Sequence, residues 1–146
     1  MDGYWKSPEL TAERLRTDII PGERVYRTGD LVRSIGDDGL VWLDRLDNVV
    51  SRRGLRTSLA EVTNAISVLD RVEAARVVSR KQGPDAQLVA FVVSNGLGTA
   101  EIRRALLRVL PEEMLPDRIV LADDLPVTSS GKIDEMSLLR AAGMEP

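Results

Sequence analysis

The sequence predicts an α+β protein, in which a short β-rich segment precedes a small mixed β-sheet covered by helices. Two observations indicate this class. Residues 88–93 form an apolar run that is hydrophobic on both faces of a strand, as is typical of the central strand of a sheet. From residue 58 onward, periodic segments follow in the order helix, strand, strand, helix, strand, loop, helix. The chain contains no internal repeat and no low-complexity linker.

Residues 1–46 contain short elements separated by turn residues. Ser7 and Pro8 are the expected cap and first residue of a short helix. Three strands are expected, over residues 24–28, 31–35 and 40–43, with a hairpin turn at 36–39. Such a segment has little of its own to pack against, so we expect it to be the end of a larger subdomain that begins upstream.

Residues 44–56 are rich in charge and have a central glycine, Gly54. This composition predicts a polar ribbon or connector, and we place the domain boundary here, with residues 47–146 forming a second subdomain. Ser58 and Glu61 form a capping box at the start of its first helix. The core-facing stripe of that helix consists of Leu59, Val62, Ile66 and Leu69.

The rest of the second subdomain is predicted from similar local signals. Strands are expected over residues 72–79, 87–94 and 116–122, with a turn at 83–85. Thr99 is the expected cap of a helix that ends at Pro111. Its inward-facing residues are expected to be Ile102, Ala105, Leu106 and Val109. Asp134 is the expected cap of the last helix, which carries Leu138 and Leu139 and stops at Gly143.

Composition excludes several classes of function. The net charge of −3 and the pI near 5.1 argue against a nucleic-acid or polyanionic-membrane partner. The absence of cysteine and histidine excludes disulfides, thiol nucleophiles, histidine-activated serines and the usual zinc sites. No apolar run reaches membrane-spanning length and no signal-peptide pattern is present, so a cytoplasmic location is expected.

A loop over residues 125–134 carries one prominent cation, Lys132. Proline, glycine and small hydroxyl residues hold this stretch in turns. The chain has only two other lysines, Lys6 and Lys81, and its remaining cations are arginines. Because lysine is a compact point charge on a mobile stem, we interpret Lys132 as a charge aimed at a ligand. A solvated loop lysine is the alternative.

Asp30 follows a glycine at the end of a predicted strand. There, its carboxylate can accept hydrogen bonds from vicinal sugar hydroxyls. The alternative is an Asx-turn that closes the loop.

Four stretches, in order, resemble the adenylate-forming superfamily, and in particular the adenylation domains of non-ribosomal peptide synthetases. Residues 26–31 (Tyr-Arg-Thr-Gly-Asp-Leu) look like the ribose-binding motif of that family. Residues 44–56 resemble its hinge motif, and residues 125–134 resemble its closing lysine motif. Residues 3–11 look like the segment that precedes these motifs. Together they extend over nearly the whole chain.

The resemblance implies a two-step reaction. A carboxylic acid, either an amino acid or an aryl or acyl acid, attacks the α-phosphate of Mg-ATP to give an acyl-adenylate and pyrophosphate. The acyl group then passes to the pantetheine thiol of a carrier protein. The family pattern implies that the Mg²⁺ ion is held by ATP and by an N-terminal adenylation core, not by any residue of this chain.

The same resemblance implies roles for individual residues. Asp30 would bind the ribose hydroxyls of ATP or AMP, and Arg45 and Trp42 would lie beside the nucleotide. Asp47 would be the hinge, and Lys132 would stabilise the charge that develops during adenylate formation. Gly54 and Arg56 would belong to the face used in thioester formation.

The chain departs from the family pattern in two ways. It contains no phosphate-binding loop and no acyl-pocket motif, so we expect it to be inactive without an N-terminal core. Several usual residues of the hinge region are replaced, at Asp44, Val49, Ser51, Ser58, Ala60 and Thr63. These replacements favour an alternative function, a non-catalytic interaction or scaffold module derived from such a subdomain.

Overall fold

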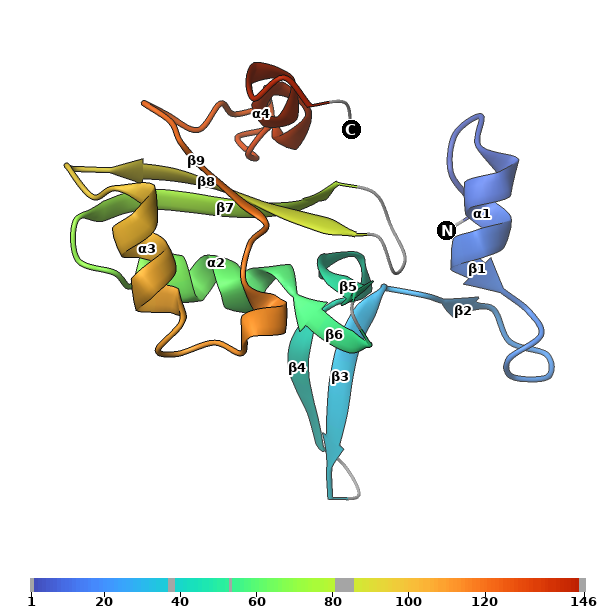
Figure 1. Ribbon diagram of the computed structural model, residues 1–146. Coiled ribbons are helices and arrows are strands. Elements are labelled where there is room, and N and C mark those ends of the chain that lie inside the picture. Colours follow the sequence, from blue (N-terminus) through green and yellow to red (C-terminus); the bar gives the residue numbers. More distant parts are fainter. Residues whose placement is uncertain (1, 37–38, 53, 81–85, 145–146) are drawn as a thin grey trace. The chain divides into compact units, whose positions relative to one another are not determined.

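The computed structural model describes residues 2–36, 39–52, 54–80 and 86–144. Its residues form two compact units, Met1–Asp47 and Asn48–Pro146, called unit 1 and unit 2 below. Figure 1 labels their helices and strands. The predicted turn at residues 83–85 lies outside the described residues.

Unit 1 contains one helix and two small antiparallel pairs of strands. Helix α1 spans Pro8–Arg14, and the pairs are β1 (Leu15–Arg16) with β2 (Val25–Tyr26) and β3 (Asp30–Ile35) with β4 (Gly39–Arg45). Pro8 begins α1 as predicted, but the Ser7 side chain makes no capping bond. The Thr11 hydroxyl instead accepts a hydrogen bond from the Tyr4 N–H and donates one to the Ser7 carbonyl, both at 2.9 Å. The strand expected over residues 24–28 is reduced to Val25–Tyr26.

A bulge in the β3–β4 hairpin decides which residues face each other. Val32 pairs with Trp42, whereas the next pair is Leu31 with Asp44, so β4 carries one extra residue, Leu43. Asp30 therefore pairs with Arg45. Without the bulge, Asp30 would face Asp44, and two carboxylates would repel each other across the hairpin.

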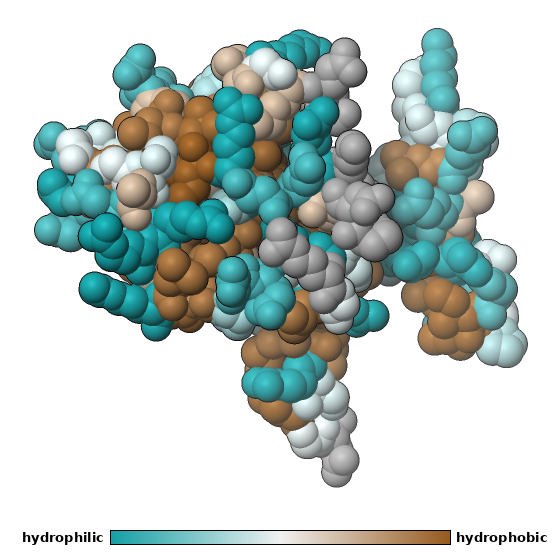
Figure 2. Space-filling view, viewed as in Figure 1, coloured by the Kyte–Doolittle hydropathy of each residue, from teal (hydrophilic) through white to brown (hydrophobic). Residues whose placement is uncertain are grey.

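Unit 1 has no buried apolar side chain among its described residues. The β3–β4 hairpin exposes large apolar residues, namely Val32, Leu40 and Trp42 on one face and Ile35 on the other. Figure 2 shows apolar residues gathered on the side of the hairpin that faces the viewer. An isolated two-stranded hairpin is at best marginally stable in water. The hairpin therefore presents an apolar surface suited to further packing.

Unit 2 opens with a short connector and a ribbon. The 3₁₀ turn η1 (Leu46–Asn48) spans the boundary between the units, and strands β5 (Val49–Arg52) and β6 (Leu55–Ser58) form an antiparallel ribbon. Helix α2 (Leu59–Ser67) follows directly. The Ser58 hydroxyl caps it by accepting the Glu61 N–H at 3.1 Å, as the sequence predicts.

The centre of unit 2 is a three-stranded sheet in the order β7 (Val72–Arg80), β8 (Gln87–Ser94), β9 (Arg118–Leu121). Strand β8 is antiparallel to β7 and parallel to β9, so the sheet is mixed and the apolar run is central. The remaining elements are α3 (Thr99–Leu106), η2 (Glu112–Met114) and α4 (Glu135–Ala141). The predicted α+β class and the predicted order of elements are confirmed.

Two apolar clusters hold helices against the sheet. Helices α2 and α3 pack on one face through Val62, Ile66 and Ile102, together with the inward residues of β7 and β8. Helix α4 packs on the other face through Leu138 and Leu139 (Figure 1). The stripe predicted for α2 is core, since Val62 and Ile66 are fully buried.

The prediction for α3 is wrong at both ends. Gly98, not Thr99, is the cap, and the Glu101 carboxylate accepts the Gly98 N–H at 2.9 Å. The helix ends at Leu106, before Pro111, so Val109 is 65% exposed instead of facing inward. Leu110 takes the buried position because the chain leaves the helix there.

The described helices are all too short or too polar to cross a membrane. Within the same residues, no group of acidic side chains is arranged to hold a metal ion.

Candidate functional site

Three predicted site residues meet around one carboxylate of unit 1. The Trp42 indole Nε1–H donates to Asp30 Oδ1 at 3.3 Å, and Arg45 Nη1 lies 3.5 Å from the same oxygen. No described residue bonds Asp30 Oδ2, and the side chain is 32% exposed. The carboxylate is thus held through one oxygen, and the side chain remains partly exposed.

The loop before Asp30 explains how the carboxylate is presented. Gly29 has φ of +80°, a conformation that favours glycine. A Cβ at this position would lie 3.0 Å from Arg14 Nη1 and 3.2 Å from Arg45 Nη2. The Thr28 hydroxyl accepts the Asp30 N–H at 3.1 Å, and the Leu46 N–H bonds the Gly29 carbonyl at 2.7 Å. Backbone and guanidinium groups therefore enclose the turn that carries Asp30.

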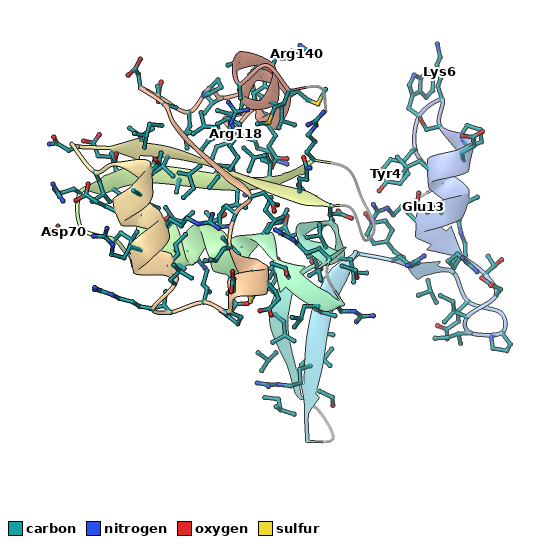
Figure 3. All side chains as sticks on the ribbon, in the orientation of Figure 1. Tyr4, Lys6, Glu13, Asp70, Arg118 and Arg140 are labelled. Atoms are coloured by element: carbon teal, nitrogen blue, oxygen red, sulfur yellow. The ribbon has the colours of Figure 1, made fainter. Side chains whose placement is uncertain are left out.

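Arg14 was not predicted as a site residue. Its guanidinium lies beside Gly29, and its side chain is only 22% exposed. Nearby, the Tyr4 and Tyr26 hydroxyls are hydrogen bonded at 2.9 Å, and this bond raises the pKa of Tyr4. Figure 3 shows Tyr4 and Glu13 on this part of unit 1. Arg14 lies 15 residues before Gly29, so no local sequence pattern could have predicted that its guanidinium lies beside Gly29.

The predicted hinge residue joins the same group. Arg45 Nη2 lies 3.2 Å from Asp47 Oδ2, so Arg45 bridges Asp30 and Asp47. Asp47 is the last residue of unit 1 and lies within η1. The structure thus brings Asp30, Trp42, Arg45 and Asp47 together within unit 1.

The lysine loop belongs to unit 2 and is closed by its own backbone. Val127 and Ile133 form an isolated antiparallel bridge, and the Thr128 N–H donates to the Lys132 carbonyl at 2.6 Å. The Gly131 N–H donates to the Thr128 carbonyl at 2.9 Å. Lys132 therefore stands at the closed base of a tight turn, next to Ile133, rather than at its tip.

The side chain of Lys132 makes no hydrogen bond or ion pair with the described residues and is exposed. The next residue but one, Asp134, caps α4 by accepting the Ser137 N–H at 3.1 Å. The bonds from Ser137 lower the pKa of Asp134. The loop is thus anchored on the side of α4, and its ammonium group remains unengaged by the described residues.

Gly54 and Arg56 lie on the β5–β6 ribbon, also in unit 2. Arg56 pairs with Ser51 across the ribbon and is exposed, and Gly54 has φ of +81°. A Cβ at Gly54 would meet no atom within 4 Å, so its conformation, not crowding, favours glycine there.

The sequence analysis did not identify one buried residue of this ribbon. Arg52 is 1% exposed and is the largest fully buried side chain among the described residues. Alternation could have revealed it, because Val50 and Arg52 lie two residues apart in a strand and Val50 is apolar.

The sequence is similar to that of known adenylate-forming proteins. Residues 61–132 match the model of the AMP-binding enzyme C-terminal domain. Tyrocidine synthase 3 of Brevibacillus parabrevis is 42% identical over 139 residues, covering 93% of this chain. The chain is thus similar to the AMP-binding enzyme C-terminal domain over about half of its length. It corresponds to the C-terminal part of an adenylation domain of the type found in non-ribosomal peptide synthetases, and the predicted resemblance is confirmed.

Other non-ribosomal peptide synthetases are also similar to this chain. The dimodular nonribosomal peptide synthase of Bacillus subtilis is 40% identical and covers 93% of this chain. A four-domain nonribosomal peptide synthetase solved with AMP and glycine has a TM-score of 0.72 and 36% identity, covering 99% of the chain. The chain spans only 2% of tyrocidine synthase 3, 6% of the dimodular synthase and 11% of the four-domain structure.

Proposed function

We propose that this chain supplies the ribose-binding end of an adenylation core together with the lysine-bearing lid of an ATP-dependent, carboxylate-activating enzyme. The observation that carries this proposal is the carboxylate of Asp30, which Trp42 and Arg45 contact through Oδ1 while the side chain stays 32% exposed. A fixed carboxylate with a free oxygen suits two neighbouring hydroxyls, as on a ribose. The indole of Trp42, 57% exposed, offers an apolar face beside it.

In the first step, a substrate carboxylate oxygen would attack the α-phosphorus of ATP, and the bond to pyrophosphate would break. Both reactants are anionic, so a positive charge aimed at the developing charge lowers the barrier. At about 4 Å and an effective dielectric near 20, one such charge contributes roughly 4 kcal/mol. Lys132 suits this role because its ammonium group is exposed and not engaged by the described residues. Bound Mg²⁺ would add charge neutralisation on the phosphates.

In the second step, the thiol of a carrier-protein pantetheine would attack the acyl carbon and release AMP. We assign the hinge between the steps to Asp47, where unit 1 ends and unit 2 begins. Rotation there would move Lys132 away and bring forward the ribbon with Gly54 and Arg56. A moving lid can supply a group for one step and withdraw it for the next.

The proposal includes an N-terminal adenylation core as an obligatory partner. Unit 1 buries no apolar side chain among its described residues, and the β3–β4 hairpin exposes large apolar residues on both faces of its register. Packing against a core would remove this surface from water. Alone, the chain also lacks a phosphate-binding loop, so pyrophosphate exchange by the isolated chain should stay at background across amino and aryl acids.

The decisive experiment is a single-turnover comparison in an enzyme assembled from this chain and the adenylation core of a relative. Lys132→Ala should slow adenylate formation by orders of magnitude. Transfer from a preformed adenylate to the thiol should change little. Lys132→Arg should rescue poorly, because a planar fork does not replace a point charge on a mobile stem. Lys6→Ala, which removes an exposed lysine of unit 1 (Figure 3), is the matched control. Intact adenylation in Lys132→Ala would refute the proposal.

A scaffold function without catalysis is the second candidate. Some residues that replace the usual hinge-region pattern have structural uses here. The Thr63 hydroxyl donates to the Leu59 carbonyl at 2.7 Å and accepts the Val77 N–H at 3.1 Å, and Ser58 caps α2. A wild-type assembled enzyme that forms neither the adenylate nor the thioester would favour this candidate.

A further inference from the structure

A buried arginine ties the β5–β6 ribbon to the sheet of unit 2. Arg52 Nη2 lies 2.8 Å from Asp117 Oδ1, and Nη1 donates to the Leu115 carbonyl at 3.2 Å. The guanidinium is 1% exposed. Sixty-five residues separate the two charged partners, so this contact is fixed by the tertiary structure alone.

The segment 115–117 is a meeting point for several elements. The second oxygen of Asp117 accepts the Leu88 N–H at the start of β8, at 2.8 Å. Arg103 of α3 donates to the Pro116 carbonyl at 3.0 Å. One short segment before β9 therefore receives bonds from β5, β8 and α3, and Arg52 is the member that comes from the ribbon.

An apolar side chain at position 52 could be buried with a smaller desolvation cost than arginine. Burying a guanidinium is unfavourable unless its partners are well placed, and replacing a buried ion pair by apolar residues is often neutral or stabilising. The Arg52 Nε–H has no hydrogen-bond partner among the described residues. What arginine provides instead is orientation, because its planar guanidinium makes two contacts that fix both the position and the rotation of strand β5.

The ribbon needs such an external fixing point. Two strands alone are marginally stable, and a register slip of one residue would turn every side chain to the opposite face. In the observed register, Val50, Arg52 and Thr57 are buried, while Ser51 and Arg56 are exposed. Arg52 thus selects the register that exposes Arg56.

We propose that Arg52, held by Asp117 and Leu115, is a positioning residue for thioester formation: it makes the ribbon rigid with unit 2, so that rotation of the unit presents Gly54 and Arg56 in one fixed orientation. This inference rests on the proposed function. Arg52 itself is buried and touches no reactant. Its effect on the second step would act through the ribbon, whereas Lys132 and the first step would be independent of it.

The first test measures hydrogen exchange on the whole chain. Arg52→Met and Asp117→Asn should each accelerate exchange of the amides of β5 and β6 by about tenfold or more, the fold-change for one lost fixing interaction. Exchange in α4 should stay as in the wild type. Arg76→Met removes another arginine–carboxylate pair of unit 2, between β7 and Glu135, and is the matched control that should leave the ribbon unchanged.

The second test compares both half-reactions in the assembled enzyme, well below the melting temperature of each variant. Arg52→Met and Asp117→Asn should slow thiol transfer on the order of 100-fold, as expected for a misplacement near 1 Å. Adenylate formation should remain near the wild-type rate. Arg52→Lys should be intermediate, since lysine keeps the charge but loses the two-point contact.

The outcomes separate this inference from the proposed function. Equal losses in both half-reactions would show a purely structural role, and unchanged ribbon exchange would show that Arg52 does not fix the ribbon; either result overturns the inference. If Arg52→Met does not fold, Asp117→Asn decides the same questions. A wild-type assembled enzyme without adenylation would refute the proposed function, while the exchange result would still decide whether Arg52 fixes the ribbon.

Discussion

Replacing Asp117 by alanine should destabilise unit 2 by an amount that follows from its contacts. The change removes the carboxylate that accepts bonds from Arg52 Nη2 and the Leu88 N–H, each at 2.8 Å. Arg52 would then be a buried cation whose remaining partner among the described residues is the Leu115 carbonyl. Breaking a buried pair in this way costs about 3–5 kcal/mol. Because the Asp117 side chain is 29% exposed, water can partly replace it, and we expect the lower value, about 3 kcal/mol.

This free energy converts to a large shift in melting temperature. For a unit of about 100 residues, 1 kcal/mol lowers Tm by about 4–8 °C, so Asp117→Ala should lower the Tm of unit 2 by about 12 °C or more. The assay is thermal unfolding of the chain followed by far-UV circular dichroism. Tryptophan fluorescence provides an internal reference, because both tryptophans, Trp5 and Trp42, belong to unit 1.

The matched control is Asp70→Ala, which removes an exposed aspartate of unit 2 (Figure 3). A surface change of this kind should alter the free energy of unfolding by no more than about 0.5 kcal/mol. If Asp117→Ala shifts Tm no more than Asp70→Ala, the reasoning about a buried, uncompensated guanidinium is wrong.

Three further changes probe other parts of the chain. Gly29→Ala in the assembled enzyme should weaken ATP binding about tenfold in a calorimetric titration, because φ of +80° strains alanine and its Cβ would crowd the guanidiniums of Arg14 and Arg45; unchanged affinity would contradict this. Asp47→Pro fixes φ at the proposed hinge and should impair one half-reaction far more than the other in single-turnover assays; equal losses would argue against a hinge there. Asp134→Ala should lower Tm at neutral pH through loss of the α4 cap, whereas at low pH the variant and wild type should converge. The folded-state pKa of Asp134 is depressed, so its contribution is present above the unfolded pKa of about 4 and is lost as pH falls through the folded value; a difference that persists in acid would refute this assignment.

Local signals in the sequence predicted much of unit 2. Ser58 and Asp134 cap their helices as expected, because a capping side chain acts on amides only three residues away. The apolar run of β8 is central because a strand buried on both faces must be apolar on both. The end of α3 was misplaced because Pro111 limits how far a helix extends but does not require it to extend that far.

The remaining features of the candidate site depend on contacts between segments that are distant in the sequence. The sequence indicated Asp30 and Arg45 separately, but the bulge at Leu43 is what pairs them, and no residue in β4 marks a bulge. The approach of Arg14 to Gly29 and the bond from Arg52 to Asp117 likewise depend on tertiary packing. The roles of Asp30, Lys132 and the other site residues stay predictions until the half-reactions are measured.

The uneven distribution of buried apolar side chains has a practical consequence for proteolysis. All the buried apolar residues that the structure describes, from Val50 to Met144, belong to unit 2. Unit 1 offers trypsin exposed arginines, such as Arg24 and Arg27, on backbone with no apolar interior to keep it closed. Brief digestion of the chain should therefore trim from the N-terminal side and leave a resistant fragment starting near Asn48. If mixing with an adenylation core slows cleavage in unit 1, the protected arginines would locate the surface that the core covers.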